Sequence, residues 1–230
     1  MNLNFPSRSG RSPIAPALLA TALALASAWH AFALSKGVYQ RDFTSTAVDQ
    51  IPDDFLVLNG TFGVKEENGN RFLELPGAPL DTFGVLFGMT EKEGLQVSGR
   101  GLGTSKGRRF PTFGFGLNGA GGYRLQVSPA KKAIELFKGD HACASSPFDW
   151  QSGKWTHFKL QIRKQAETPA TWKVQGKVWT EGSEEPKAWS IAWEEKEEPI
   201  PGRASLWGSP FANTPIRFDD LRVGEAQADN

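Results

Sequence analysis

Short runs in which apolar and polar residues alternate recur along most of this chain. The clearest run covers residues 155–163, where Phe158, Leu160 and Ile162 alternate with polar neighbours. Such alternation is typical of a β-strand with one face buried and the other in water. Residues 172–179 repeat the pattern. We therefore predict two strands, each with one apolar and one polar face.

A second group of runs predicts a meander of three strands. Residues 113–117 place three large apolar side chains on one face and only glycine on the other. Turns rich in Gly, Asn and Pro separate this run from apolar alternation at residues 123–127 and 133–138. Consecutive short strands joined by such turns favour antiparallel neighbours.

The last run, residues 216–223, changes phase partway. Ile216 and Phe218 occupy even positions, whereas Leu221 and Val223 occupy odd ones. One extra residue restores the register, so we predict a β-bulge near Asp219-Asp220.

Helical periodicity is nearly absent, and about 10–12 strands at a spacing of some 8–14 residues are typical of a sandwich. The predicted fold is an all-β, antiparallel jelly-roll sandwich of two sheets with little helix. We place this single domain at residues 53–224, after a polar lead-in over residues 34–52. Residues 225–230 are expected to be a frayed tail.

The first 33 residues have the pattern of a secretory signal peptide. Arg8 and Arg11 precede the apolar run ALLATALALASA, and small residues offer cleavage after Ala28 or Ala33. This order of charge, apolar run and small residues predicts an exported protein with no membrane segment after cleavage. An uncleaved N-terminal anchor is the alternative. Export would place the protein in the periplasm, at the cell surface or outside the cell.

Charge and cysteine content exclude several classes of function. Removing Arg8 and Arg11 from the 26 basic residues leaves 24 against 25 acidic residues, a formal charge of −1. A nearly neutral chain does not favour a nucleic-acid partner. Cys143 is the only cysteine, so internal disulfides and zinc fingers are excluded. A catalytic thiol with His141 or His157 as partner is less favoured than an incidental thiol.

Four segments together resemble a known superfamily. Residues 155–162 read WTHFKLQI, residues 172–179 read WKVQGKVW, residues 182–189 read GSEEPKAW, and residues 218–223 read FDDLRV. This set is similar to the concanavalin A-like lectin/glucanase jelly roll, in particular to laminin-G-like modules of secreted bacterial proteins. The resemblance implies the fold. It leaves the function open, because the superfamily spans lectins, adhesion modules and hydrolases.

The polar faces of the two clearest strands are the candidate ligand site. Sugar sites combine an aromatic plate with amide, carboxylate or cationic groups, and these faces offer Lys159 together with our predicted ligand-binding residues His157, Gln161, Arg163, Lys173, Gln175, Lys177 and Trp179. The alternative is an ordinary solvated sheet face. Trp150 and Trp207 are further candidates for exposed aromatics, whereas Trp172, Trp189 and Trp193 are expected in the core.

Glycoside hydrolysis is the enzymatic alternative. It requires two carboxylates about 5–10 Å apart, and no strand carries an E-x-D-x-x-E pattern. The acidic residues at 194–195 and 197–198 lead into Pro199 and read as a loop. The sequence therefore favours a module without catalysis that binds a glycan or cell-surface polysaccharide. A glycan-processing enzyme and a structural or adhesion protein of the envelope remain the alternatives.

A structural calcium ion is the one cofactor that the resemblance raises. Asp219 and Asp220 at the predicted bulge are the candidate ligands, and no cofactor is required. Calcium takes six to eight oxygen ligands, and the sequence does not supply a full set. A bulge with two solvated aspartates is the simpler alternative. The oligomeric state is left open.

Overall fold

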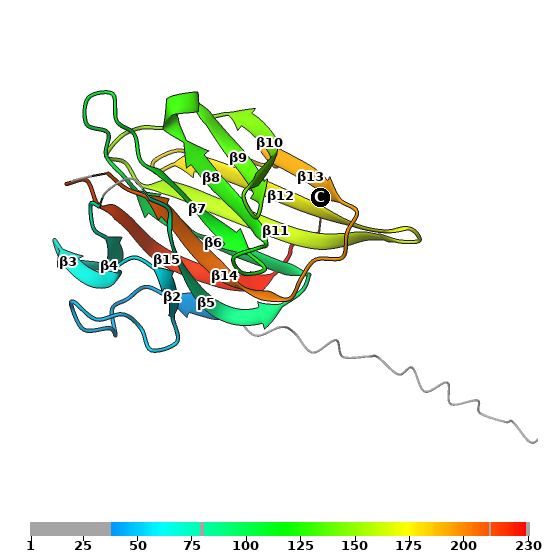
Figure 1. Ribbon diagram of the computed structural model, residues 1–230, viewed down its shortest axis with the longest axis horizontal. Coiled ribbons are helices and arrows are strands. Elements are labelled where there is room, and N and C mark those ends of the chain that lie inside the picture. The colour runs from blue at the N-terminus through cyan, green and yellow to red at the C-terminus, as the bar shows by residue number, and fades with distance from the viewer. Residues whose placement is uncertain (1–37, 79–80, 212, 229–230) are drawn as a thin grey trace, which may run out of the picture. The chain divides into compact units, whose positions relative to one another are not determined.

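Two antiparallel sheets form the structure. The computed structural model describes residues 38–78, 81–211 and 213–228, so the predicted signal peptide lies outside the described residues. Sheet A has the order β13-β12-β11-β6-β15-β4-β3, with β1 paired to β15. Sheet B has the order β10-β9-β8-β7-β14-β5-β2 (Figure 1). The predicted all-β sandwich is therefore confirmed.

The strands of sheet A are β1 (Tyr39–Arg41), β3 (Gly63–Glu67), β4 (Asn70–Leu75), β6 (Leu95–Leu102), β11 (Thr156–Glu167), β12 (Ala170–Thr180), β13 (Ile191–Glu195) and β15 (Ile216–Glu225). Those of sheet B are β2 (Leu56–Asn59), β5 (Phe83–Glu91), β7 (Thr112–Leu117), β8 (Tyr123–Ser128), β9 (Ala133–Lys138), β10 (His141–Pro147) and β14 (Gly202–Ser209). In the described residues the one helical element is a 3-10 turn, Pro129–Lys131. No helix in this part of the chain is long and apolar enough to cross a membrane.

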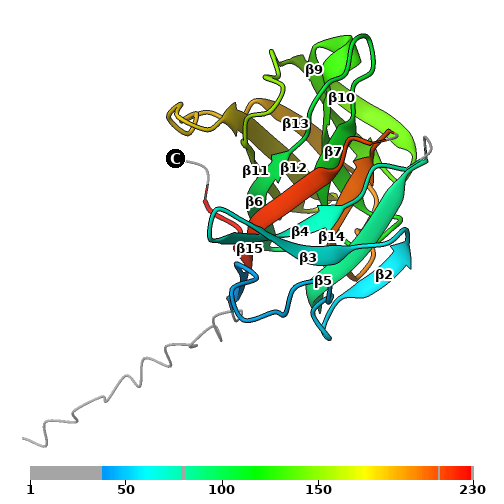
Figure 2. The same cartoon turned by 90° about the vertical axis from the view of Figure 1, so that its left-hand side faces the viewer.

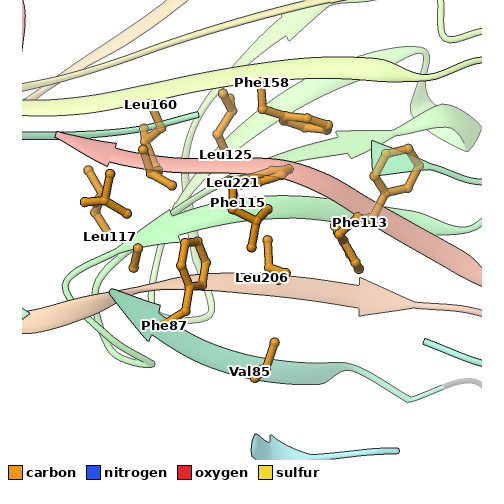
Figure 3. Packing of buried hydrophobic residues seen from close by; sticks show 14 of the residues in the cluster. Val85, Phe87, Phe113, Phe115, Leu117, Leu125, Phe158, Leu160, Leu206 and Leu221 are labelled. Atoms are coloured by element: carbon orange, nitrogen blue, oxygen red, sulfur yellow. The ribbon is translucent and has the colours of Figure 1, made fainter. Parts of the chain in front are cut away.

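Phenylalanine rings from both sheets interlock in the core. The ring of Phe158 on β11 lies 5.0 Å from that of Phe115 and 5.8 Å from that of Phe113, both on β7 (Figure 3). All three side chains are fully buried. Burying a side chain of this size contributes about 1.5–3 kcal/mol to the free energy of unfolding.

Glycines on β6 make room for these rings. A Cβ atom added at Gly99 would come within 2.6 Å of the Phe115 ring, and one at Gly101 within 2.8 Å of the Phe113 ring. Because β6 presents no side chain there, the large rings of the facing sheet fill the space. The glycines that alternate along residues 99–103 are therefore explained by packing.

The predicted meander and bulge are both present. Strands β7, β8 and β9 pair consecutively, Phe115 opposite Leu125 and Leu125 opposite Leu136. The pairing of β15 with β6 shifts register between Asp219 and Arg222. The two-face alternation of β11 and β12 is confirmed as well, and the two strands lie side by side (Figure 2).

The described residues form fifteen strands, more than the predicted 10–12. The additional strands are β1, β2, β10 and β14. Strand β1 lies in the segment predicted as a lead-in and pairs with β15, while Phe43 is fully buried. The sandwich therefore begins before residue 53.

Two further expectations are wrong in the described residues. The tail was expected to fray, but the Ala226 amide donates to the Gly94 carbonyl at 3.0 Å and Gln227 hydrogen-bonds Gln161. The acidic pair at 194–195 was expected in a loop, but both residues belong to β13. Glu195 is only 2% exposed.

Candidate functional site

The polar sides of β11 and β12 lie directly beside one another. In the paired strands, the cross-strand neighbours are His157 and Trp179, Lys159 and Lys177, Gln161 and Gln175, and Arg163 and Lys173. We call these eight residues the polar face. It is the outer face of sheet A, because Phe158, Leu160, Trp172 and Val174 point into the core. The structure thus brings all seven predicted ligand-binding residues onto one surface.

His157 and Trp179 stack at one end of the polar face. Their ring centroids lie 5.2 Å apart and the ring planes differ by 11°. Burial lowers the pKa of His157, which keeps the imidazole neutral at neutral pH. One ring face of Trp179 is therefore taken by His157.

Gln161 lies beneath the C-terminal tail. Its Nε2 donates to Gln175 Oε1 at 3.1 Å and to the Gln227 carbonyl at 3.3 Å, while its Oε1 accepts from the Gln227 amide at 3.0 Å. Gln161 is fully buried. Its hydrogen-bonding groups are thus used within the chain, and its role is to hold the tail against the sheet.

The connection between β12 and β13, residues 181–190, folds over the two central lysines. Glu185 Oε1 lies 2.5 Å from Lys159 Nζ and 2.7 Å from Lys177 Nζ. Lys177 Nζ also donates to the Pro186 carbonyl at 2.8 Å. Burial opposes ionisation of Glu185, but the two lysines outweigh it and lower its pKa. The connection is therefore held to the sheet by a carboxylate shared between two cations.

A pocket of about 350 Å³ opens between this connection and the tail. It is lined by Lys173, Gln175, Lys177, Lys187, Ala188, Trp189, Gln227 and Ala228. The Lys177 Nζ lies 5.0 Å from the centroid of the Trp189 ring, at cation–π distance. We call it the Trp189 pocket. Its lining combines an aromatic ring, two amides and three lysines, and contains no carboxylate.

Trp189 corrects one expectation from the sequence. It was assigned to the core, because its spacing from Ile191 and Trp193 places all three on one side of a strand. Strand β13 begins only at Ile191, so Trp189 lies in the preceding connection and is half-buried at the pocket. Trp193 is half-buried but packs against the core, and Trp172 is in the core as predicted.

The pocket uses only part of the predicted set. Lys173, Gln175 and Lys177 line it, whereas His157, Gln161, Arg163 and Trp179 do not. The residues that the sequence reasoning missed are Lys187, Trp189 and Gln227. Their signal was weak, since the connection and the tail carry no periodic pattern that fixes where they fold.

The two carboxylates predicted as calcium ligands form ion pairs with an arginine. Arg100 Nη2 lies 2.8 Å from Asp219 Oδ2, and Arg100 Nε lies 2.8 Å from Asp220 Oδ2. Asn70 Nδ2 also donates to Asp219, at 3.0 Å. Burial raises the pKa of Asp219 against these hydrogen bonds.

No group of three or more His, Cys, Asp or Glu residues in the described chain is placed to hold a metal ion. The guanidinium of Arg100 stands where a cation would bind, so Asp219 and Asp220 do not fit a calcium site. The pair stabilises the bulge instead.

The two other tryptophans and the cysteine that the sequence raised as candidate functional residues are explained by their packing and burial. Trp150 packs edge-on against Phe113, with ring centroids 6.3 Å apart. Trp207 is half-buried on the outer side of sheet B, where its Nε1 donates to Ser205 Oγ at 2.8 Å. Burial raises the pKa of the Cys143 thiol, which opposes the thiolate that a nucleophile requires.

Comparison with solved structures shows a shared fold. The carbohydrate-binding module CBM66 from Bacillus subtilis matches with a TM-score of 0.51 and 11% identity, over 75% of this chain and 96% of that one. The carbohydrate recognition domain of Emp47p matches with a TM-score of 0.53 and 12% identity, over 82% and 96%. The lumenal domain of VIP36, solved with calcium and mannose, matches with a TM-score of 0.54 and 6% identity, over 84% and 91%.

A scan of protein-family models and a search of curated proteins find no match to this sequence. At identities this low, the structural matches establish the shared two-sheet sandwich fold and no more.

Proposed function

We propose that this protein is a carbohydrate-binding module whose ligand occupies the Trp189 pocket. The pocket carries the proposal, because it joins an accessible indole ring to amide and ammonium groups in one hollow. Sugars offer a flat C–H face for an aromatic ring and hydroxyls for polar side chains, so this combination fits a sugar residue. Its volume of about 350 Å³ lies at the small end of ligand pockets.

The lining favours binding over hydrolysis. Glycoside hydrolysis requires two carboxylates on either side of the scissile bond, and the residues lining the pocket include none. Glu185, the carboxylate paired with Lys177, is also held by Lys159. A carboxylate neutralised by two cations has a lowered pKa and is a poor proton donor. We therefore propose a module without catalytic activity.

The solved neighbours support a glycan as the partner. Two of them are a carbohydrate-binding module and a carbohydrate recognition domain by name. The finer likeness to laminin-G-like modules of secreted bacterial proteins rests on the sequence segments alone. Export likewise rests on the first 33 residues, and we propose a periplasmic, surface or extracellular location on that basis.

A glycan array with the wild-type protein and Trp189→Ala tests the proposal. We expect wild-type binding to at least one glycan class and a loss of about tenfold or more in the variant, since a stacking aromatic contributes on the order of 1–3 kcal/mol. Phe110→Ala is the matched control, because Phe110 is 38% exposed in the connection between β6 and β7 and does not line the pocket.

Binding that is equal in the two variants would place the sugar elsewhere on the molecule. Absence of binding to any glycan would favour the structural or adhesion alternative. Release of reducing sugar from a bound glycan would establish the hydrolase alternative and overturn the non-catalytic proposal.

A further inference from the structure

An arginine lies between two aromatic rings on the outer side of sheet B. Leu125 of β8 points into the core, so its neighbour Arg124 points outward. The Arg124 guanidinium carbon lies 4.7 Å from the centroid of the Phe137 ring on β9 and 5.2 Å from that of the Trp207 ring on β14. Glycines on β7, which lies between β8 and β14, leave the space that this arrangement needs. The guanidinium is thus held by contacts on two sides.

This cation has no counter-ion in the described part of the chain. No carboxylate there forms an ion pair or hydrogen bond with Arg124, and its buried Nε has no hydrogen-bond partner. Asp140 acts on it only from beyond ion-pair distance, and burial lowers the pKa of Arg124 despite that charge. Other arginines at the sheets, such as Arg100 and Arg217, each pair with carboxylates.

An unpaired, partly desolvated charge is unfavourable in a folded protein. Cation–π contacts offset only part of that cost. In the described residues neither Nη group of Arg124 forms a hydrogen bond, and neither is among the buried unpaired atoms, so both reach solvent. Arg124 thus presents the free end of a planar guanidinium, which recognises a carboxylate in bidentate form.

The surroundings favour a sugar carboxylate over a small anion. Gln126 lies outward on the same strand, one side-chain step from Arg124, and is half-buried. The one carboxylate on the neighbouring strand position, Glu135, is neutralised by Lys131 at 2.8 Å. The two aromatic side chains offer apolar surface for the C–H groups of a sugar ring. The amide can bind its hydroxyls, and the free guanidinium can bind its acidic group.

We propose that Arg124, held between Phe137 and Trp207, is the anion-binding residue of a second ligand site that takes an acidic sugar such as a uronate. The site lies on the outer face of sheet B, whereas the Trp189 pocket lies on the outer face of sheet A. The two sites are separated by the whole sandwich, so this inference does not depend on the Trp189 pocket.

Calorimetric titration with trigalacturonic acid and with its full methyl ester tests the proposal. Both probes present the same sugar rings, and only the acid carries carboxylates. We expect the acid to bind at least about tenfold more tightly than the ester, since charge-assisted bidentate hydrogen bonds are stronger than neutral ones. Sodium acetate at matched carboxylate concentration should not compete.

Two variants assign the effect to the residue. Arg124→Gln should lower the affinity for the acid to the affinity for the ester. Arg124→Lys should give an affinity between those of the wild type and Arg124→Gln, because lysine keeps the charge but lacks the planar guanidinium. Arg108→Gln removes one exposed arginine in the connection between β6 and β7 and should leave the difference unchanged.

Several results would overturn the assignment. These are equal binding of acid and ester to the wild type, displacement by acetate, or an acid preference that survives Arg124→Gln. Equal binding of acid and ester to the wild type overturns the assignment even if an Arg124 variant does not fold. Loss of acid binding in Trp189→Ala, with Arg124→Gln unaffected, would move the acidic ligand to the Trp189 pocket.

Discussion

The Tyr123 hydroxyl donates a 2.7 Å hydrogen bond to Glu195 Oε2, which joins β8 of sheet B to β13 of sheet A. The same carboxylate oxygen lies 2.8 Å from Lys138 Nζ on β9. The other oxygen accepts the Glu197 amide at 2.8 Å. One buried carboxylate therefore connects the two sheets at this edge. No disulfide joins them, because the chain has a single cysteine.

Replacing Glu195 with Gln should lower the free energy of unfolding by about 1–3 kcal/mol at pH 7, because the buried side chain loses its charge-assisted bond with Lys138, which keeps only the exposed Glu197 as a charged partner. Burial opposes ionisation of Glu195, but the bonds from Lys138, Glu197 and Tyr123 outweigh it and lower its pKa. A lowered pKa stabilises the fold above the ordinary value of 4.5, and that stabilisation is lost as pH falls through the folded-state value.

Urea unfolding of the wild type and Glu195→Gln across pH 3–7 checks this. The gap between the two proteins should be widest at neutral pH and should narrow in acid. A difference in the free energy of unfolding that stays constant with pH would mean that the charge of Glu195 does not cause the loss of stability.

Arg100 should be essential to the fold because it compensates a buried charge. Asp219 is 1% exposed, and Arg100→Met would leave it without its cation. We expect a loss of about 3–5 kcal/mol in the free energy of unfolding. Arg222→Met, an exposed arginine on β15, should change the value by no more than about 0.5 kcal/mol. Similar effects of the two variants in chemical denaturation would contradict the prediction.

Gly176 should tolerate no side chain, since it faces the opposite sheet. A Cβ atom there would come within 2.7 Å of a Leu125 methyl group and 3.2 Å of Ile191. Gly176→Ala is expected to destabilise the protein by about 1–3 kcal/mol through overpacking. Gly224→Ala is the control, because its added Cβ would meet only Val38, at an ordinary 3.9 Å. Equal melting temperatures of the two variants would mean that the sheets can move apart to accommodate the added methyl group at Gly176.

The stack of His157 on Trp179 should be visible in the titration of the imidazole. Burial is the main cause of the lowered pKa of His157. Trp179→Ala removes the covering ring, so the pKa should rise toward 6.5, its ordinary value. Gln175→Ala, on the same strand and face, should leave it unchanged. An NMR titration that shows no rise in Trp179→Ala would mean that other groups bury His157.

The interior strands of sheet A were predictable because burial of one face imposes a period on the sequence. In β11 and β12 that period fixed both the core residues and the polar face, and the phase change in β15 located the bulge. Two of the edge strands carry no such period. Neither β2 nor β10 has a buried residue, so no apolar face imposes an alternation on either sequence.

The candidate sites depend on where distant segments of the chain fold, and the local alternation of apolar and polar residues does not determine this. The Trp189 pocket exists because the tail and the β12–β13 connection fold over β12. The position of Arg124 between Phe137 and Trp207 requires four strands, β9, β8, β7 and β14, in register, and β14 carried too few apolar residues to be predicted. Long-range pairing determines both arrangements.

The last strand of the chain is an interior strand of its sheet. Strand β15 lies between β6 and β4 and also pairs with β1, so residues from the start, the middle and the end of the domain meet along it. A ribosome that has not yet released residues 216–225 holds a chain in which β6 and β4 have no common neighbour. Sheet A therefore cannot close until β15 is available, and a chain shortened before residue 216 would expose two unpaired strand edges and be prone to aggregate.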